Sequence, residues 1–422
     1  LPIDSGTRIG VKDSAGWIGL ESNGSGYPFL WVPNNNSTAS RIDVRTGKEV
    51  GRYRLAPVDV SASASRTTVD LRGAMWVGNR QAGTAIKIGL EMNGGCVDRD
   101  GDGVIQTSRD LDSNGVISNS EVLAWGHDEC VVFEVSFHPG YEGVYVPGTY
   151  TGPYNGNPLP RSLSLAPDNH VWIGSYNYQK YYEIDDVTGR ILRTIDVGVV
   201  GNSPYGSVFD PDGMMWSVNL FNGLYRIDTR VDPPTIARVN VPTYGVGLGQ
   251  DSTVVVYGHN GTISRINARS LEVLQSVPMG GVGRGIVTTP NNHIWGANSG
   301  SNTVDHFDEL GRLVIRIPVN VGPTGVSLDA DGYIWTVGNE NDTAFRIDPV
   351  TNTVDMKVAI PGSQGHYSYS DMTGMVVRTV TTGTGTWTIV KDGFSENRLW
   401  SHLEWEEMLP DGAKIAVQVR SS

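Results

Sequence analysis

Tryptophan recurs inside short apolar runs along this chain, at intervals of about 40–45 residues over most of its length. The runs are FLWVPN, AMWVGN, HVWIGS, MMWSVN, VVVYGH, HIWGAN and YIWTVG, and their central positions are Trp31, Trp76, Trp172, Trp216, Val256, Trp295 and Trp335. Only the interval from Trp76 to Trp172 is clearly longer than the others. A period of this length is typical of folds in which similar supersecondary units pack side by side.

Each repeat carries further turn and strand signals. A motif such as RID, Arg226–Asp228, follows the apolar run after a polar turn, and a DPDG or DADG turn precedes several of the runs. Each unit therefore contains about four short strands connected by glycine, aspartate and asparagine turns, which is typical of a β-propeller blade. The seven slots predict an all-β fold, a seven-bladed β-propeller with four-stranded blades. We expect its tryptophans to fill the core between neighbouring blades.

Closure of the ring requires one more strand near the end of the repeats. The segment Gly365–Val377, GHYSYSDMTGMVV, has the pattern of another repeat's opening strands. We expect it to pair with the N-terminal strand PFLWV and complete one composite blade, because this pairing removes open sheet edges. Residues 1–380 are therefore assigned to the propeller.

Residues 381–422 no longer follow the repeat and are predicted to form a short C-terminal β extension. The segment is too short for a core of its own. It is either a β-sandwich module cut short, in which case the native chain continues, or a set of strands that packs on the propeller through Trp387, Trp400 and Trp405. The sequence does not start with Met, so we expect that a leader was removed or that the chain is a fragment.

The repeat SPYGSVFDPDGMMWSVNLFNGLYRID resembles those of the virginiamycin B lyase and NHL-like propellers in its Pro-x-Gly, its Asp-Gly turn, its Trp strand and its polar turn into RID. The resemblance covers residues 27–377 and implies the propeller fold. For the lyases of this group, the resemblance implies a magnesium site on one face of the propeller. A His before the Gly of the inner strand and a Glu after the Trp strand would hold the ion. Other residues occupy those positions here, namely Tyr205, Arg284 and Thr324 before the glycines, and Asn79, Ser175, Asn219, Asn298 and Gly338 after the Trp strands. His366 is near an equivalent slot but lacks the acidic partner.

The longest interval contains an acidic segment that runs between the only two cysteines, Cys96 and Cys130. Its second half, Asp110–Glu121, reads DLDSNGVISNSE and matches the EF-hand calcium loop. Gly115 permits the sharp bend of such a loop, and Ile117 stands at its apolar position. The expected ligands are the side chains of Asp110, Asp112, Asn114 and Glu121 and the backbone carbonyl of Val116.

The first half, Asp98–Arg109, follows the same pattern but ends in an arginine, which cannot bind a cation. We expect Asp110, the next residue, to close the first loop as well as open the second. The expected ligands of the first loop are Asp98, Asp100, Asp102, the Val104 carbonyl, Asp110, and Gln106 or a water. The prediction is an insert over residues 93–160 in blade 2, with tandem calcium loops over 98–121.

About two calcium ions are expected, because many oxygen ligands on a flexible loop favour calcium over magnesium. Zinc is disfavoured because no His or Cys lies inside the acidic run. We expect calcium and a Cys96–Cys130 disulfide to fold the insert together. A disulfide is typical of an oxidising compartment, so the predicted location is secreted or cell-surface. The following stretch, His138–Pro160, contains four tyrosines, at positions 141, 145, 150 and 154, which either recognise sugars or proteins or pack against the insert.

Charge and hydropathy argue against two classes of partner. The formal net charge of −13 disfavours nucleic acid, and no stretch is long and apolar enough to span a membrane. We therefore predict a monomeric, secreted, calcium-stabilised propeller that acts as a binding or scaffold module for an extracellular protein or carbohydrate. The alternative is a lyase-like or lactonase-like enzyme acting in the central channel, with the candidate residues His366, Arg284, Arg161, Tyr205 and Glu340.

Overall fold

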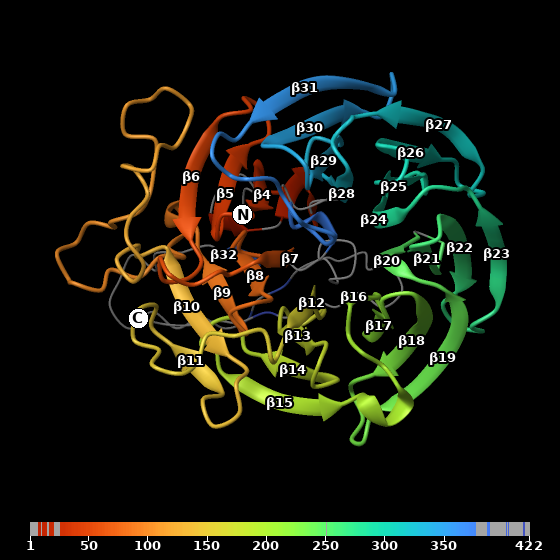
Figure 1. Cartoon of the computed structure of the whole chain (residues 1–422), viewed down its shortest axis with the longest axis horizontal. Coiled ribbons are helices and arrows are strands. Elements are labelled where there is room, and N and C mark those ends of the chain that lie inside the picture. Colours follow the sequence, from red (N-terminus) through yellow and green to blue (C-terminus); the bar gives the residue numbers. More distant parts are fainter. Residues whose placement is uncertain are drawn as a thin grey trace. The chain divides into compact units, whose positions relative to one another are not determined.

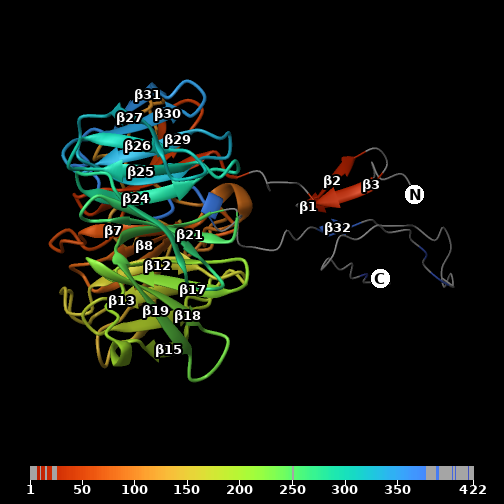
Figure 2. The same cartoon turned by 90° about the vertical axis from the view of Figure 1, so that its right-hand side faces the viewer.

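The computed structural model describes residues 26–249 and 251–376, four short strands outside them, and residues 402, 404 and 417. The chain forms two compact units, Leu1–Leu20 with Gly385–Ser422 and Glu21–Thr384. The larger unit is a seven-bladed β-propeller, seen along its axis in Figure 1 and from its edge in Figure 2. This confirms the predicted fold class.

Five consecutive blades are four-stranded antiparallel sheets whose strands follow sequence order. Blade 3 consists of β12 (Pro160–Leu165), β13 (Val171–Ser175), β14 (Lys180–Ile184) and β15 (Ile191–Asp196). Blade 4 consists of β16 (Gly206–Phe209), β17 (Met214–Val218), β18 (Asn222–Asp228) and β19 (Thr235–Pro242). Blade 5 consists of β20 (Tyr244–Leu248), β21 (Thr253–Gly258), β22 (Thr262–Asn267) and β23 (Val273–Pro278).

The next two blades repeat this arrangement. Blade 6 consists of β24 (Gly283–Thr288), β25 (Ile294–Asn298), β26 (Thr303–Phe307) and β27 (Leu313–Pro318). Blade 7 consists of β28 (Pro323–Leu328), β29 (Ile334–Gly338), β30 (Thr343–Asp348) and β31 (Thr353–Ala359). The first strand of each blade lies next to the first strand of the following blade, so these strands line the central channel (Figure 1).

Blade 2 departs from the four-stranded pattern because it gains an outer strand. It consists of β7 (Ala64–Val69), β8 (Met75–Asn79), β9 (Thr84–Ile88), β10 (Val131–Ser136) and β11 (Gly143–Tyr145). The acidic insert connects β9 to β10 and begins with the short 3-10 helix η1 (Glu91–Asn93). A similar 3-10 helix, η2 (Gly198–Val200), lies between blades 3 and 4.

Blade 1 is composite, as predicted. Its strands β4 (Phe29–Pro33), β5 (Thr38–Asp43) and β6 (Glu49–Arg54) form a three-stranded sheet. The returning chain takes the inner position, where His366 forms a β-bridge with Asn34 and the Trp31 amide donates to the Met372 carbonyl at 2.8 Å. Val377, the last residue of the predicted closing segment, lies outside the described residues.

The repeated tryptophans form the core between blades. Trp31, Trp76, Trp172, Trp216, Trp295 and Trp335 are each at most 1% exposed. Trp76 of blade 2 packs with Leu163 and Ile173 of blade 3, and Trp335 of blade 7 packs with Leu30 of blade 1. The Trp position of the repeat therefore contributes to the core between neighbouring blades and also to the packing of blade 7 on blade 1. This confirms the predicted role of the tryptophans.

The smaller unit contains two antiparallel strand pairs. Strand β1 (Thr7–Ile9) pairs with β32 (Thr386–Thr388), and β2 (Val11–Ser14) pairs with β3 (Trp17–Leu20). Trp387 lies in β32 opposite Arg8, whereas Trp400 and Trp405 lie outside the described residues. The grouping of both termini in one unit differs from the sequence-based division at residue 380. In the described part of the chain, no helix has the length and apolar character needed to cross a bilayer.

Candidate functional site

The two acidic loops of the insert lie beside β6 and β10 at the rim of the ring (Figure 1, orange). In the second loop, Asp110, Asp112 and Glu121 offer carboxylate oxygens that all lie within 4.8 Å of one another. In the first loop Asp98 and Asp100 meet in the same way. The structure therefore brings together most of the predicted acidic side chains, in two separate groups.

Glu129 supplies the third carboxylate of the first group, in place of the expected Asp110. Its Oε1 accepts a hydrogen bond from the Arg99 amide at 2.6 Å, and its Oε2 accepts one from the Gln106 amide at 2.9 Å. Arg99 and Gln106 are the second and ninth residues of that loop, counted from Asp98. Glu129 lies far from the loop in sequence, which is why the pattern did not identify it.

Glu121 holds the same place in the second loop. It accepts hydrogen bonds from the Leu111 amide at 2.8 Å and from the Ser118 amide at 2.7 Å. Leu111 and Ser118 are again the second and ninth residues of their loop, counted from Asp110. The two loops therefore close in the same way, one with a local glutamate and the other with a glutamate that the fold supplies.

Backbone amides hold the remaining acidic side chains. Asp98 accepts hydrogen bonds from Gly101 at 2.7 Å and Gly103 at 2.9 Å, and the amide of Gly103 in particular lowers the pKa of the Asp98 carboxyl. The Ser118 amide similarly lowers the pKa of Glu121 to about 2. The carboxyl groups of Asp98 and Glu121 are therefore negatively charged at neutral pH, as carboxylate ligands of a cation must be.

The corresponding contacts in the second loop have the same form, with Asp110 accepting from the amide of Gly115 at 2.7 Å. Asp102 and Asn114 accept hydrogen bonds from the amides of Val104 and Val116, each at 2.8 Å. The Val104 and Val116 carbonyls stay predicted ligands.

The disulfide bond joins Cys96 to Cys130, as predicted. Cys96 precedes the first loop by two residues, and Cys130 directly follows Glu129. The Val97 amide also donates to the Glu129 carbonyl at 3.0 Å. The covalent link thus holds Glu129 next to the first loop.

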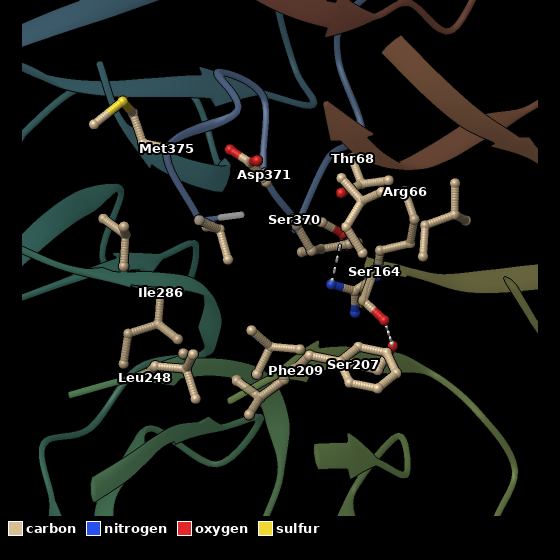
Figure 3. A pocket seen from close by; sticks show the side chains of 18 of the residues that line it. Arg66, Thr68, Ser164, Ser207, Phe209, Leu248, Ile286, Ser370, Asp371 and Met375 are labelled. Atoms are coloured by element: carbon tan, nitrogen blue, oxygen red, sulfur yellow. Dashed lines mark hydrogen bonds between the residues drawn. The ribbon is translucent and has the colours of Figure 1, made fainter. Parts of the chain in front are cut away.

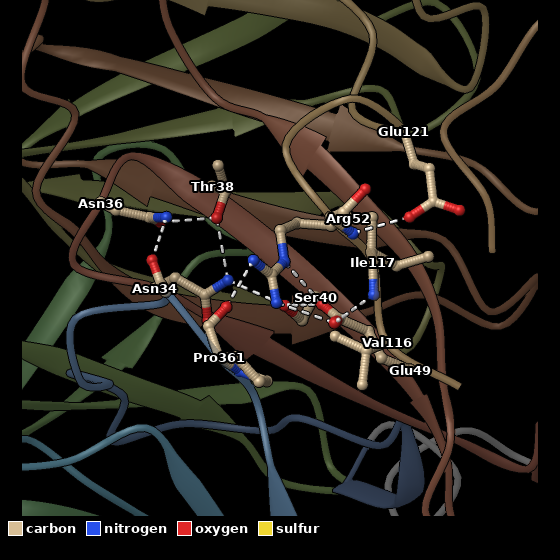
Figure 4. A network of polar contacts seen from close by, with 12 residues as sticks. Asn34, Asn36, Thr38, Ser40, Glu49, Arg52, Val116, Ile117, Glu121 and Pro361 are labelled. Carbon is tan, nitrogen blue, oxygen red and sulfur yellow. Dashed lines mark hydrogen bonds and ion pairs between the residues drawn. The ribbon is translucent and has the colours of Figure 1, made fainter. Parts of the chain in front are cut away.

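The second loop is bonded to blade 1 (Figure 4). The Ile117 amide donates to Glu49 Oε2 at 3.2 Å, and the Glu49 amide donates to the Gly115 carbonyl at 3.2 Å. Glu49 also forms a buried ion pair with Arg52 at 2.7 Å. Arg52 in turn donates to the carbonyl of Pro361, in the segment that follows blade 7, at 2.9 Å. The second loop is therefore connected, through Glu49 and Arg52, to the segment that closes the ring.

The tyrosines after the insert pack on one another. Tyr150 is 7% exposed, and the rings of Tyr141, Tyr145 and Tyr154 lie edge-on to it at centroid distances of 6.2, 4.9 and 5.1 Å. The same stretch also lies against the end of the insert, because a Cβ on Gly126 would lie only 3.0 Å from the Pro147 carbonyl oxygen. The tyrosines therefore pack as one cluster beside the insert, while Tyr141 stays 43% exposed.

The channel brings together three of the five enzyme candidates. Arg161 donates to the Tyr205 hydroxyl at 2.8 Å, and both residues lie in a cluster that also contains Arg284. His366 is instead buried at the blade 1 bridge, where its Nδ1 lies 3.0 Å from Asn34 Oδ1 and burial lowers its pKa to about 4. Glu340 is exposed.

The channel cluster also contains residues that the sequence analysis missed, namely Arg66, Arg80, Tyr244, Tyr367 and Tyr369. Several occupy the same register as Tyr205 and Arg284, at the start of the innermost strand of a blade. That register was visible in the sequence, but only the ring places these positions opposite one another.

No family model matches the sequence, and the comparison with curated proteins finds no match either. Solved structures do resemble it. Virginiamycin B lyase from Staphylococcus aureus matches with a TM-score of 0.51 and 17% identity over 73% of this chain and 87% of the lyase chain. A functionally unknown protein from Desulfotomaculum acetoxidans matches with a TM-score of 0.57 and 11% identity over 81% and 97% of the two chains.

A third similar structure is the hydrazine synthase of Kuenenia stuttgartiensis, with a TM-score of 0.50 and 14% identity over 72% of this chain and 88% of that chain. These likenesses support the predicted resemblance to the virginiamycin B lyase propellers. At such identities they show the fold, and proteins of this fold serve many functions. The function must therefore be argued from the residues of this chain.

Proposed function

We propose that this chain is a secreted or cell-surface β-propeller that binds about two calcium ions in its insert and serves as a binding or scaffold module for an extracellular protein or carbohydrate. The observation that carries the calcium proposal is the equivalence of the two loops. Glu121 and Glu129 accept hydrogen bonds from the same two loop positions, although only Glu121 belongs to a loop in sequence.

The donor set supports calcium among the common cations. Each group combines three carboxylates with further oxygen donors, and hard oxygen ligands in a flexible loop are typical of calcium sites. Each loop offers another side-chain oxygen, from Asp102 or Asn114, and the Val104 and Val116 carbonyls complete the predicted ligands. Unneutralised, three carboxylates at such distances would repel one another, so a bound cation would stabilise the insert.

We assign the calcium a structural role. Glu49 and the second loop exchange backbone and side-chain hydrogen bonds, so a cation that orders this loop would also support blade 1 and the closed ring. The disulfide next to Glu129 would likewise stabilise the first loop. The same disulfide supports the proposed location outside the reducing cytosol, because such bonds persist mainly in oxidising compartments.

The calcium proposal is tested by calcium titration calorimetry of the metal-free chain, with thermal melts in calcium and in EDTA. We expect about two sites in the unchanged chain, about one in Glu121→Gln and in Glu129→Gln, and a lower melting temperature in EDTA. The matched control is Asp59→Asn, an exposed carboxylate in the loop after β6. Two full sites in Glu129→Gln, or no calcium in the unchanged chain, would overturn the assignment.

The partner is tested by probing arrays of carbohydrates and of extracellular proteins with the calcium-loaded chain. We expect at least one ligand class to be retained, and we expect the retention to weaken in EDTA. Turnover of a lactone or streptogramin substrate by the unchanged chain would instead favour the enzyme alternative. The enzyme remains the second candidate function because Arg161, Arg284 and Tyr205 lie close together in the channel.

A further inference from the structure

One end of the central channel contains a cluster of four arginines and four tyrosines contributed by different blades. The arginines are Arg66 in β7, Arg80 after β8, Arg161 in β12 and Arg284 in β24. The tyrosines are Tyr205 before β16, Tyr244 in β20, and Tyr367 and Tyr369 in the closing segment. Arg66, Tyr205, Tyr244 and Tyr369 are buried, whereas Arg80, Arg161, Arg284 and Tyr367 are partly exposed and form the mouth of the cluster.

The tyrosine hydroxyls form a connected network. The Tyr205 and Tyr244 hydroxyl oxygens lie 2.6 Å apart, and those of Tyr244 and Tyr369 lie 2.8 Å apart. The Tyr367 hydroxyl lies 3.2 Å from that of Tyr205 and accepts a hydrogen bond from Arg161 at 3.0 Å. The buried hydroxyl groups of the cluster are therefore connected to that of Tyr367 at the mouth.

Each arginine stacks on one of these rings. The guanidinium carbons of Arg80 and Arg161 lie 4.2 Å and 4.3 Å from the ring centroids of Tyr367 and Tyr205. Arg284 lies 4.6 Å from the ring of Tyr244, and Arg66 lies 4.9 Å from that of Tyr369. Stacking orients the planar guanidinium groups. Arg80 donates from Nε and Nη2 to Ser63, and Arg284 donates from Nε to the Ser299 hydroxyl, so an oxygen ligand would use the remaining N–H groups of the cluster.

In the part of the chain that the structure describes, these arginines have no carboxylate as an ion-pair partner. Arg66 Nη2 and Arg161 Nε are buried nitrogens with no hydrogen-bond partner in this part of the chain. Arg66 is only 3% exposed and also lines the adjoining cavity, where its Nη1 donates to Ser370 Oγ at 3.4 Å (Figure 3). Burial of a cation without an ion-pair partner is unfavourable, so a bound anion would stabilise these buried arginines.

We propose that this end of the channel is a binding site for a small ligand that carries an oxyanionic group, a carboxylate, phosphate or sulfate. The guanidinium groups of Arg161 and Arg284 would bind its oxygens from two sides of the channel, and the tyrosine hydroxyls would complete the contacts. Arginine suits this task because its parallel N–H groups match the spacing of carboxylate and phosphate oxygens. The site is independent of the calcium loops, which belong to the rim of blade 2.

The cluster also predicts that binding is linked to a proton. Burial opposes ionisation of Tyr367, but Arg161 and the hydroxyls of Tyr205 and Tyr244 outweigh it and lower the pKa of Tyr367 to about 7. Arg80, Arg284 and Tyr369 are the other titratable groups around it, and His259 lies near Tyr244. A bound anion takes over the interaction with the arginines, so it raises the pKa of Tyr367 and a proton is taken up.

The experiment is titration of the calcium-loaded chain with sodium phosphate, sulfate or acetate at constant ionic strength set with chloride. Calorimetry, the melting temperature and the tyrosinate difference absorbance are followed at pH 7.5. We expect saturable binding of at least one of the three anions, a higher melting temperature and a loss of tyrosinate signal. The anion that binds best identifies the head group.

The variants are Arg161→Gln and Arg284→Gln, with Arg269→Gln as the matched control because Arg269 is an exposed arginine between β22 and β23. We expect at least tenfold weaker anion binding in the first two and no change in the control. Tyr367→Phe keeps all four arginines but loses one hydroxyl of the site, so it should bind the anion more weakly than the unchanged chain and without the loss of tyrosinate signal. It also provides a test if an arginine variant does not fold.

Two results would overturn the anion site, namely no response beyond that to chloride for any of the three anions, or unchanged affinity in folded Arg161→Gln. A tyrosinate signal that persists unchanged at saturation would overturn the linkage to a proton. None of these results depends on calcium, so failure of this site and failure of the calcium loops are distinguishable.

Discussion

Glu49 Oε2 accepts a hydrogen bond from the Ile117 amide at 3.2 Å, and this contact joins the second acidic loop to blade 1. The same carboxylate forms two hydrogen bonds with Arg52, at 2.7 and 2.8 Å, and Arg52 donates to the carbonyl of Pro361. Three segments that are distant in sequence therefore meet at one buried ion pair, shown in Figure 4.

Replacement of Glu49 tests the importance of this junction. Glu49→Ala leaves Arg52 buried without its partner, and loss of one member of a buried ion pair costs about 3–5 kcal/mol of unfolding free energy. Urea unfolding in calcium measures the loss. The control is Arg45→Ala, which removes an exposed ion pair to Asp331 and should lower the free energy of unfolding far less. Equal effects of the two substitutions would show that the junction contributes nothing beyond a surface contact.

The disulfide should matter more for the first loop than for the second. Cys96 and Cys130 close a separation of 34 residues, and loss of such a link costs roughly 3–4 kcal/mol in the chain-entropy model. In the double variant Cys96→Ser/Cys130→Ser, Glu129 is no longer held next to Asp98, whereas Glu121 stays within its own loop. Calcium titration calorimetry should therefore show one weakened site and one nearly unchanged site. Two equally weakened sites would contradict this division.

The sequence identified features that depend on local spacing. The buried tryptophans and the seven blades followed from the repeat, because a strand's place in a blade is set by its neighbours in sequence. The carboxylates of the second loop, Asp110, Asp112 and Glu121, came together for the same reason. The composite blade 1 followed instead from the requirement that the ring close.

Features that depend on the closed ring could not be read from spacing. Glu129 reaches the first loop only because β10 and the disulfide return the chain to it. Arg66 and Tyr367 are far apart in sequence, and they enter one cluster only when blade 2 and the closing segment meet at the channel. Tertiary structure, rather than any local motif, assembles both groups.

The aspartate of the turn before the Trp strand is predicted to stabilise blade 7 through the indole. Trp335 Nε1 donates to Asp329 Oδ2 at 2.7 Å, and the same carboxylate accepts from the amides of Asp331 and Tyr333. Asp329→Ala leaves a buried indole N–H without a partner, at a cost of about 1–3 kcal/mol, together with the loss of the turn contacts. Asp329→Asn keeps an acceptor oxygen and should cost less in thermal or urea unfolding. Equal losses in the two variants would contradict the role of the indole bond.

Glu134 in β10 should make the folded chain less stable as the pH rises. Its side chain is fully buried, its Oε1 has no hydrogen-bond partner among the described residues, and its Oε2 accepts only from the Tyr154 hydroxyl at 3.2 Å. Burial raises the pKa of Glu134 from 4.5 to about 7, against a smaller opposing effect of the Tyr154 hydrogen bond. Between these two values the folded state binds the proton more strongly than the unfolded state does. The contribution of Glu134 to stability is therefore fully present below pH 4.5 and is lost as the pH rises to about 7.

Glu134→Gln removes this dependence, because the amide has no proton to lose in that range. One pKa unit corresponds to about 1.4 kcal/mol, so the variant should gain on the order of 3 kcal/mol over the unchanged chain between about pH 4.5 and pH 8. Urea unfolding at several pH values, each compared with the unchanged chain, isolates the effect from other titrating groups. The control Glu272→Gln, an exposed glutamate before β23, should follow the unchanged chain. Parallel profiles for Glu134→Gln and the unchanged chain would mean that Glu134 ionises in the folded state as freely as in the unfolded one.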